Sequence, residues 1–223
     1  MANSTLRPQL SILTFMVHSD MFDIATHSCA IDSNVILESA VPTSGPVNGG
    51  TTVTLKGENF VSTEEILVQF ASSGFVGNVS GTFISSSLLS CVAPAAIGAG
   101  SVNITVALNS QQFTASSISF LYYVVPGTAT IAPPSGPYNA QTPVQIIGTQ
   151  FVDTQEITIR FQNGSNVAYA NATFANSTSL SCVVPGFASA MFADVAVALN
   201  GLNYLTSAGT FQFYGMDFYV LQC

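Results

Sequence analysis

Charged residues are scarce in this chain. They make up 6% of its 223 residues, whereas soluble domains average about 25%. The cations are one lysine, Lys56, and two arginines, Arg7 and Arg160; with 11 acidic residues the net charge is −8. A nucleic-acid-binding protein needs a cationic face to neutralise phosphates. We therefore expect no nucleic-acid partner, and an anionic membrane surface is disfavoured for the same reason.

Long apolar runs are lacking as well. No stretch of the sequence approaches the roughly 20 apolar residues that a membrane-spanning helix requires, so we expect no membrane insertion. A short apolar stretch at 10–17 follows Arg7 and has no clear small-residue cleavage site after it. It is a weak match to a secretion signal, and we interpret it as a strand of the mature protein.

A catalytic set is missing too. The two histidines, His18 and His27, lie close to Asp20 and Asp23. Two imidazoles and two carboxylates could bind a divalent metal, but their spacing fits no zinc motif, and we interpret the segment as a polar tail. No Ser-His-acid arrangement or phosphate-binding glycine motif is evident. We therefore predict no enzyme activity, no cofactor and no metal site.

Repetition is what the chain has in place of these motifs. Residues 44–60 read SGPVNGGTTVTLKGENF, and residues 135–151 read SGPYNAQTPVQIIGTQF. The match continues without a gap at an offset of 91 residues, through Cys91 and Cys182 to Phe120 and Phe211. This indicates an internal duplication. The predicted parts are an extension at 1–40, a domain at 41–123, a linker at 124–131, a domain at 132–215 and an extension at 216–223.

Each repeat has the pattern of an all-β domain. Short runs rich in β-branched and aromatic residues are separated by turn residues, as in TTVTLKG and TPVQIIG. About seven such runs per repeat favour a sandwich of the immunoglobulin type. We expect Pro46 and Pro137 at an edge strand or a strand start, where a missing N–H is tolerated. We expect Gly57 and Gly148 at a bulge or tight bend.

The first repeat resembles the TIG domain, also called IPT, in three motifs: Pro-x-Ser-Gly-Pro from Pro42, Gly-Gly-Thr from Gly49 and Gly-x-Asn-Phe from Gly57. A Cys-x-x-Pro motif and a closing FLYY complete the resemblance. It implies two tandem immunoglobulin-like sandwiches with strand-like extensions. The family occurs in plexin-type receptors and other cell-surface proteins, beside the catalytic domains of some glycan-processing enzymes, and in some transcription factors. The second repeat departs from it at Ala140-Gln141, where the family favours Gly-Gly.

The four cysteines allow two interpretations. Cys91 and Cys182 occupy equivalent points of two separate domains, so they should lie too far apart to pair with each other. Each could instead form a disulfide with the nearer tail, Cys29 with Cys91 and Cys182 with Cys223. Alternatively Cys91 and Cys182 are buried thiols in strands. The family often has a second cysteine upstream of the Cys-x-x-Pro cysteine, and neither repeat has it.

Acceptor sites for N-linked glycans, Asn-x-Ser/Thr, occur at Asn3 and at five positions within the repeats. These five candidates are Asn78, Asn103, Asn163, Asn171 and Asn176. Glycans would supply the hydration that the missing charges do not. Asn103 lies in the expected strand VNITV and has to face outward to be used. The alternative is a polar surface loop without modification.

The neutral surface and the extensions together suggest a function based on contact. Segments 9–17 and 216–223 are apolar and strand-like, and such strands need somewhere to be buried. They either pack on their own domain or add to a sheet edge of a neighbouring subunit. We predict a secreted or cell-surface structural or adhesive protein that forms a homo-oligomer or helical polymer. The alternatives are a ligand-binding receptor ectodomain and an accessory module of a carbohydrate-active enzyme; the absence of Trp makes the last the weakest.

Overall fold

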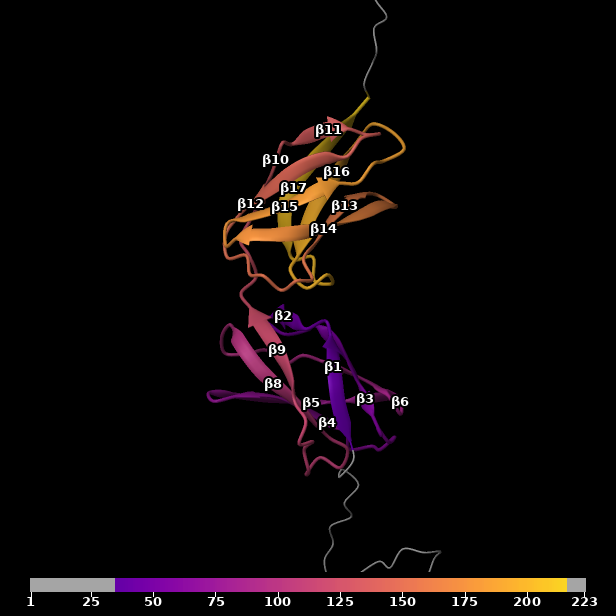
Figure 1. Ribbon diagram of the computed structural model, residues 1–223, viewed down its shortest axis with the longest axis vertical. Coiled ribbons are helices and arrows are strands. Elements are labelled where there is room, and N and C mark those ends of the chain that lie inside the picture. The colour runs from indigo at the N-terminus through magenta and orange to yellow at the C-terminus, as the bar shows by residue number, and fades with distance from the viewer. Residues whose placement is uncertain (1–34, 216–223) are drawn as a thin grey trace, which may run out of the picture. The chain divides into compact units, whose positions relative to one another are not determined.

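The computed structural model describes residues 35–215, and these residues form strands without any helix. Two sandwiches follow one another along the chain (Figure 1). The strands of the first sandwich are β1 (Ile36–Val41), β2 (Ser44–Pro46), β3 (Thr52–Glu58), β4 (Leu67–Ser72), β5 (Phe75–Ser80), β6 (Thr82–Ser85), β7 (Leu88–Val92), β8 (Gly100–Ala107) and β9 (Ile118–Tyr123). The strands of the second are β10 (Thr130–Ala132), β11 (Ser135–Pro137), β12 (Thr142–Ile147), β13 (Thr158–Asn163), β14 (Asn166–Asn176), β15 (Ser179–Val184), β16 (Met191–Ala198) and β17 (Thr206–Tyr214).

The first sandwich has two layers with the strand orders β1-β3-β7-β6 and β2-β9-β8-β4-β5. Figure 1 shows β8 and β9 on one side of this sandwich and β1, β3 and β6 on the other. Neighbouring strands are antiparallel except β2 and β9, which are parallel. The chain changes sheet between β1 and β2, where the Val41–Pro42 peptide bond is cis. Pro46 lies in β2, an edge strand, as its missing N–H predicts.

The second sandwich repeats this plan, with β14 joining its two layers. The first half of β14 pairs with β13 and its second half with β15, so the strand belongs to both layers. In the first sandwich β5 and β6 take these two roles, separated at Gly81. The Gly81 N–H donates to the Ile66 carbonyl at 2.9 Å, and the Ala172 N–H donates to the Ile157 carbonyl at 3.0 Å. These two bonds are related by the 91-residue offset.

Other contacts recur at the same offset. The Phe60 N–H donates to the Ser86 carbonyl and the Phe151 N–H to the Ser177 carbonyl, both at 3.0 Å. Asn59 and Gln150 each adopt a left-handed backbone with φ of 63°. The turn therefore lies two residues after the glycines that we expected to form it. Gly57 itself lies opposite a bulge in β1 between Leu37 and Ser39.

Each sandwich has its own apolar core, because alternate residues of every central strand point between the layers. In β3, Val53 and Leu55 are fully buried, while the neighbouring threonines and Lys56 point outward. Aromatic rings meet edge to face in both cores, at 5.4 Å between Phe70 and Phe120 and at 6.1 Å between Phe161 and Phe211. This geometry is preferred by the ring quadrupoles. The structure thus confirms the predicted fold class, an all-β chain with two immunoglobulin-like sandwiches.

The structure differs from the expected boundaries in two places. Strand β1 begins at Ile36 and pairs with β3, so the first sandwich includes residues that we had placed in the 1–40 extension. Val35 and Leu37 are buried in its core. Strand β10 begins at Thr130, inside the expected linker. The segments 9–17 and 216–223, which we predicted to be strands, lie outside the described residues.

Candidate functional site

All five predicted glycan acceptors within the repeats lie on the protein surface. Asn78, Asn103, Asn163, Asn171 and Asn176 are each exposed. Asn103 lies in β8 between the buried residues Val102 and Ile104, so its side chain faces outward as its use requires. The other four lie on the strands β5, β13 and β14, and not in the polar loop of the alternative interpretation. Glycosylation of these residues stays a prediction.

The acceptors differ in how their side-chain amides are bound. The Asn163 Nδ2 atom, which would carry a glycan, donates to the Phe192 carbonyl at 2.6 Å. The Asn78 Oδ1 atom accepts a bond from Gln69 Nε2 at 3.2 Å. The Asn176 Oδ1 atom accepts bonds from the N–H and hydroxyl of Thr178 at 2.9 and 2.8 Å. In the last two the nitrogen is not the bonded atom, so those contacts leave the attachment atom to solvent.

Cys91 and Cys182 are buried, and neither forms a disulfide with another described residue; the choice between the two interpretations stays a prediction. Burial raises the pKa of Cys91 to about 12 and that of Cys182 to about 11. Both thiols are therefore protonated and unreactive at neutral pH. Cys29 and Cys223, the tail partners of the proposed disulfides, lie outside the described residues.

The histidine-containing segment, with His18, His27, Asp20 and Asp23, also lies outside the described residues. Between residues 35 and 215 no three His, Cys, Asp or Glu side chains come together to form a metal site. In the same range, no helix has the length and apolarity needed to cross a bilayer.

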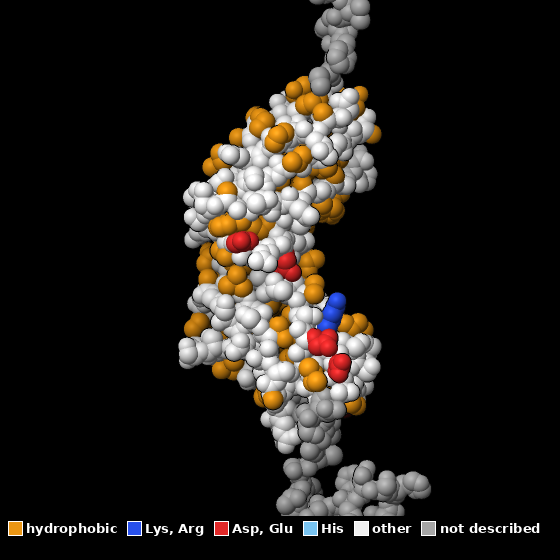
Figure 2. Space-filling view, viewed as in Figure 1, with side chains coloured by type: hydrophobic (Ala, Val, Ile, Leu, Met, Phe, Trp, Pro, Cys, Tyr) orange, Lys and Arg blue, Asp and Glu red, His pale blue; other side chains and the backbone are white. Residues whose placement is uncertain are grey.

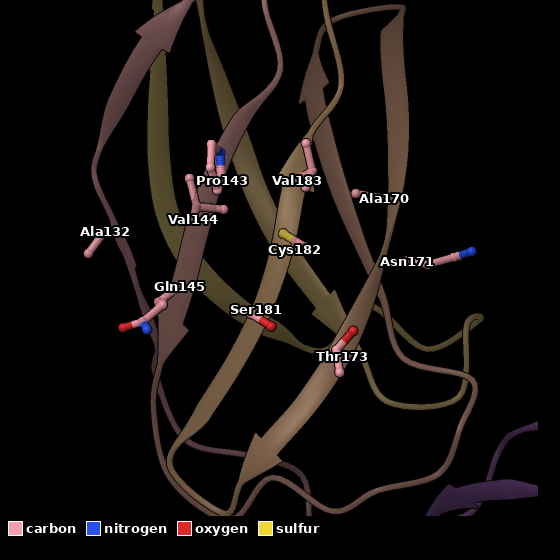
Figure 3. A pocket seen from close by; sticks show the side chains of 10 residues that line it. All are labelled: Ala132, Pro143, Val144, Gln145, Ala170, Asn171, Thr173, Ser181, Cys182 and Val183. Atoms are coloured by element: carbon pink, nitrogen blue, oxygen red, sulfur yellow. The ribbon is translucent and has the colours of Figure 1, made fainter.

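A shallow depression of about 700 Å³ lies on the outer face of the sheet formed by β10, β12, β15 and β14. Figure 3 shows Ser181 and Thr173 on adjacent strands in it, and Asn171 pointing away from the sheet. Its lining includes Gln145, Pro143 and Cys182 but neither a charged nor an aromatic side chain. Its hydroxyl and amide side chains offer hydrogen bonds, and its alanine, valine and proline side chains offer apolar contact.

Side chains from both sandwiches meet in a hydrogen-bonded contact, which we call the joint. Asn200 is 2% exposed, and its Nδ2 atom donates to the Ser44 carbonyl at 2.9 Å. The Thr51 hydroxyl donates to Asn203 Oδ1 at 2.7 Å. Asn200 is oriented by its own loop, because its Oδ1 atom accepts the N–H groups of Leu202 and Asn203 at 3.3 and 2.9 Å. The first half of the joint therefore presents a carbonyl and a hydroxyl, and the second half presents two amides.

A carboxylate and an aromatic ring complete the joint. Glu156 Oε2 accepts bonds from the N–H and hydroxyl of Thr43 at 3.1 and 3.0 Å. Tyr123, the last residue of β9, is 2% exposed and packs with the core residues of the second sandwich. Its burial, together with the nearby Glu156 charge, raises the pKa of its hydroxyl. The linker is bound as well, since the Thr206 hydroxyl donates to the Pro126 carbonyl at 3.0 Å.

Sequence reasoning did not identify the joint. One signal was available: both repeats contain the run VALN, which ends at Asn109 and Asn200. A polar side chain that closes an apolar strand at the same place twice indicates a conserved turn within the repeat. It does not tell which of the two asparagines touches another domain.

A second surface cluster lies on the outer face of the second sandwich. The Arg160 guanidinium carbon lies 4.7 Å from the centre of the Tyr204 ring, within cation–π distance. Tyr169 is 60% exposed, and its ring centre is 5.9 Å from that of Tyr204. At the positions of Arg160 and Tyr169 the first repeat has Gln69 and Asn78. The aromatic and cationic cluster is thus a feature of the second sandwich.

Comparison with known proteins adds the family and its relatives. The IPT/TIG domain family matches residues 36–122 and 126–213. Plexin A3 of Danio rerio is 25% identical over 148 residues, which cover 65% of this chain and 8% of the plexin. Plexin-A2 of Mus musculus is 28% identical over 154 residues, or 68% of this chain and 8% of the plexin. The chain thus spans less than a tenth of the length of these relatives.

The solved structures agree on the fold. The full extracellular region of plexin A4 aligns with a TM-score of 0.55 at 22% identity, over 82% of this chain and 16% of that structure. A second structure of the same region aligns with a TM-score of 0.50 at 19% identity, over 88% of this chain and 20% of that structure. At this level of identity, the likeness concerns the arrangement of strands.

Proposed function

Because the chain belongs to the IPT/TIG domain family, we propose that it is a non-catalytic structural or adhesive protein of the extracellular space. Its copies associate into a filament or surface layer. In one route, a strand of one copy adds to a sheet edge of the next, and main-chain hydrogen bonds join the two. The candidate donor strands are the segments 9–17 and 216–223, outside the described residues. N-linked glycans on the exposed asparagines would keep the remaining surface hydrated.

The observation that best supports this proposal is the position of β1 at the edge of its sheet. One N–H of this strand, that of Leu37, is already bound, to Ser116 Oγ at 2.9 Å. This six-residue strand ends the order β1-β3-β7-β6. Its outward side chains include Ile36, 44% exposed, and Val41, 49% exposed. Proteins usually protect a long edge strand with charged side chains, proline, a bulge or a covering loop. Strand β1 has one exposed charge, Glu38, and one bulge between Leu37 and Ser39, and its other exposed side chains are apolar. The corresponding strand of the second sandwich, β10, has three residues, so β1 is the better acceptor.

The exterior as a whole also suits an assembly. Figure 2 shows one face on which apolar and uncharged side chains predominate and charged ones are few. Such a surface has few charged groups that would lose water when two copies meet. A catalytic protein would need titratable groups gathered in a cleft. In the described part of the chain, the depression on the second sandwich is lined by neutral residues.

Lysine substitutions on the β1 edge test the proposal. I36K combined with V41K should suppress any polymer that forms by strand addition, because added charge on an edge strand opposes pairing. V183K is the matched control: Val183 is 48% exposed but lies on β15, inside its sheet. Electron micrographs and light scattering of the full chain measure the outcome. A wild-type chain that stays monomeric at all concentrations contradicts the proposal.

A receptor-like role is the second candidate, and the cluster of Arg160, Tyr169 and Tyr204 favours it. Tyrosine and arginine are the residues most enriched among energetically dominant interface contacts. In this role the cluster would bind a partner protein, and the plexin relatives make such a use reasonable. Tyr169→Ala should then weaken partner binding about tenfold or more, whereas it should leave self-association unchanged. Binding of the full chain to intact cells measures the first effect.

A further inference from the structure

The joint between the two sandwiches has two halves, and the duplication gives each half a second copy at a free end of the tandem pair. The first sandwich carries the counterparts of the second half at Glu65, Asn109 and Gln112. The second sandwich carries the counterparts of the first half at Ser135, Thr142 and Tyr214. We propose that these free halves bind each other, so that a second copy of this chain docks end to end. The proposal rests on the self-association proposed above and names a contact for it.

The counterpart of the second half of the joint is already formed in the first sandwich. Asn109 Oδ1 accepts the N–H groups of Gln111 and Gln112 at 3.1 and 3.0 Å, as Asn200 Oδ1 accepts those of Leu202 and Asn203 in the joint. Asn109 Nδ2 lies 3.4 Å from Gln112 Oε1. This loop therefore holds its amide as the joint does. Little ordering would be needed on docking, and pre-organisation of this kind favours binding.

The buried residues of the first half have counterparts in the second sandwich that are more exposed. This is the difference expected if the counterparts have no partner bound. Tyr123 is 2% exposed where it packs on the second sandwich, whereas Tyr214, its counterpart, is 43% exposed. Ser44 and Thr51 are 1% exposed, and their counterparts Ser135 and Thr142 are only partly buried.

The residues of the second half of the joint are likewise more buried than their counterparts. Asn200 is buried, whereas its counterpart Asn109 is only partly buried. Glu65, the counterpart of Glu156, is exposed. Position by position, the residues buried or half-buried at the joint are more accessible at the free ends.

Two substitutions make the contact between copies weaker than the joint. Pro134 stands where the first repeat has Thr43, so the N–H and hydroxyl that bind Glu156 have no counterpart for Glu65. Gln112 replaces Asn203 and is longer by one methylene. Three parts of the joint can still form between copies: the bond from Asn109 to the Ser135 carbonyl, the bond between Thr142 and Gln112, and the burial of Tyr214. The contact is therefore reversible and depends on protein concentration.

A second copy of this chain is the occupant that the structure supports, because its opposite end carries the complementary half. The contact is head to tail: the Asn109 end of one copy meets the Tyr214 end of the next. A heterologous contact of this kind leaves one free half at each end of an open assembly, so the assembly grows into a filament or closes into a ring. It needs no strand exchange and could act with or without the strand addition proposed above.

Two end variants of the full chain test this polarity. Asn109→Asp keeps the side-chain oxygen that accepts the N–H groups of Gln111 and Gln112. It replaces the Nδ2 donor with a carboxylate oxygen, which would face the Ser135 carbonyl of the next copy. Tyr214→Ser removes the ring at the other end. Sedimentation velocity over a range of concentrations should show wild type growing in mass. Each variant alone should associate at least about tenfold more weakly. An equimolar mixture should give dimers and nothing larger, because it retains one intact pair of ends.

Two further variants serve as controls, Asn103→Asp and Tyr169→Ser, which make the same chemical changes at exposed sites on the sandwich faces. Both should associate like wild type. End variants that assemble as well as wild type overturn the end-to-end contact and leave self-association standing. A mixture that forms no dimers overturns it too, as does loss of association in either control. A wild-type chain that remains monomeric overturns both this contact and the proposed self-association.

Discussion

At Gly57 the fold leaves no room for a side chain. A Cβ atom there would overlap the carbonyl oxygen of Ile36 in the neighbouring strand and come within 2.8 Å of the Phe60 ring. At Gly148, its counterpart, the nearest atoms are 2.7 Å away on the Phe151 ring and 3.1 Å away on the Ala129 side chain. The two glycines are equivalent in sequence but face different obstacles, because a backbone atom gives way less easily than a side chain.

This difference predicts unequal costs for the same substitution. Gly57→Ala should lower the free energy of unfolding by about 3 kcal/mol and Gly148→Ala by about 1 to 2 kcal/mol. Gly74→Ala is the control, since a Cβ at Gly74 meets nothing within 4 Å. Urea unfolding followed by circular dichroism measures all three. Equal losses at Gly57 and Gly148 would contradict the assigned cause.

The buried thiols and phenols predict that the fold loses stability in alkali. Burial raises the pKa of Cys91 to about 12 and that of Cys182 to about 11, from an ordinary 9.0. Burial likewise raises the pKa of Tyr122 and Tyr123. Between the unfolded and folded pKa values the folded state binds more protons, so stability is complete below about pH 9 and falls as pH rises through 11.

The measurement is the urea midpoint at pH 8, 10 and 11. Cys91 alone should contribute a loss of about 2 kcal/mol by pH 11. Cys91→Ala should be less stable than wild type at pH 8 because of the cavity, but its stability should change less with pH. A variant with the full wild-type pH dependence would show that Cys91 is not involved.

Residue identities allowed some of these features to be predicted and concealed others. The 91-residue offset predicted that Gly57 and Gly148 are equivalent. The missing N–H of Pro46 predicted that this residue lies at a sheet edge. The offset did not predict that the left-handed residues are Asn59 and Gln150, because asparagine and glutamine tolerate that conformation without requiring it. It could not decide the state of Cys91 and Cys182 either, since a buried strand position suits a thiol and a disulfide alike.

At the scale of the element, the strand β14 was the main omission. From the sequence we assigned no strand there and offered a polar surface loop as one alternative. The structure has an 11-residue strand in which Ala168, Ala170, Ala172 and Phe174 are partly buried and alternate with exposed residues. Alternation with period two was present in VAYANATFAN and is the standard signal for a half-buried strand. Small alanines made that signal weak.

The position of the acceptors on such strands predicts how glycans are distributed. In a glycosylating host we expect Asn78, Asn103, Asn171 and Asn176 to be occupied, because each is exposed. Asn163 should be occupied least, because its Nδ2 atom donates to the Phe192 carbonyl and is withdrawn from modification once the hairpin forms. Glycopeptide mass spectrometry measures occupancy site by site. Full occupancy at Asn163 together with an empty Asn171 would contradict this order.

At the scale of the whole molecule, the duplication predicted two sandwiches but not how they touch. Asn200 binds the carbonyl of Ser44, 156 positions away in the sequence. Local sequence patterns do not predict a contact between residues so far apart in the chain. The residues of the joint lie at loop ends and strand ends, where the sequence is polar in both copies. The largest difference in burial between the joined end and the opposite end is that of Tyr123, 2% exposed, against Tyr214, 43% exposed. The second sandwich therefore contacts the first as a separate binding partner would. The side chains that make this contact have counterparts in the other repeat.

The two asparagines allow the strength of the joint to be measured within one chain. Asn200→Ala removes the bonds to Leu202 and Asn203 in its own loop and also the donor to the buried Ser44 carbonyl. Asn109→Ala removes the equivalent loop bonds only. Loss of the loop bonds should cost about 1 kcal/mol in either case, and the unpaired carbonyl should add about 1 to 3 kcal/mol at Asn200.

Both variants are compared at low concentration, where copies do not associate. The chain has no tryptophan, so unfolding in urea is followed by circular dichroism. The difference between the two losses reports the bond across the joint, because everything else that the substitutions remove is duplicated. If Asn200→Ala costs no more than Asn109→Ala, the bond from Asn200 to the Ser44 carbonyl does not stabilise the joint, and the equivalent bond from Asn109 loses its template.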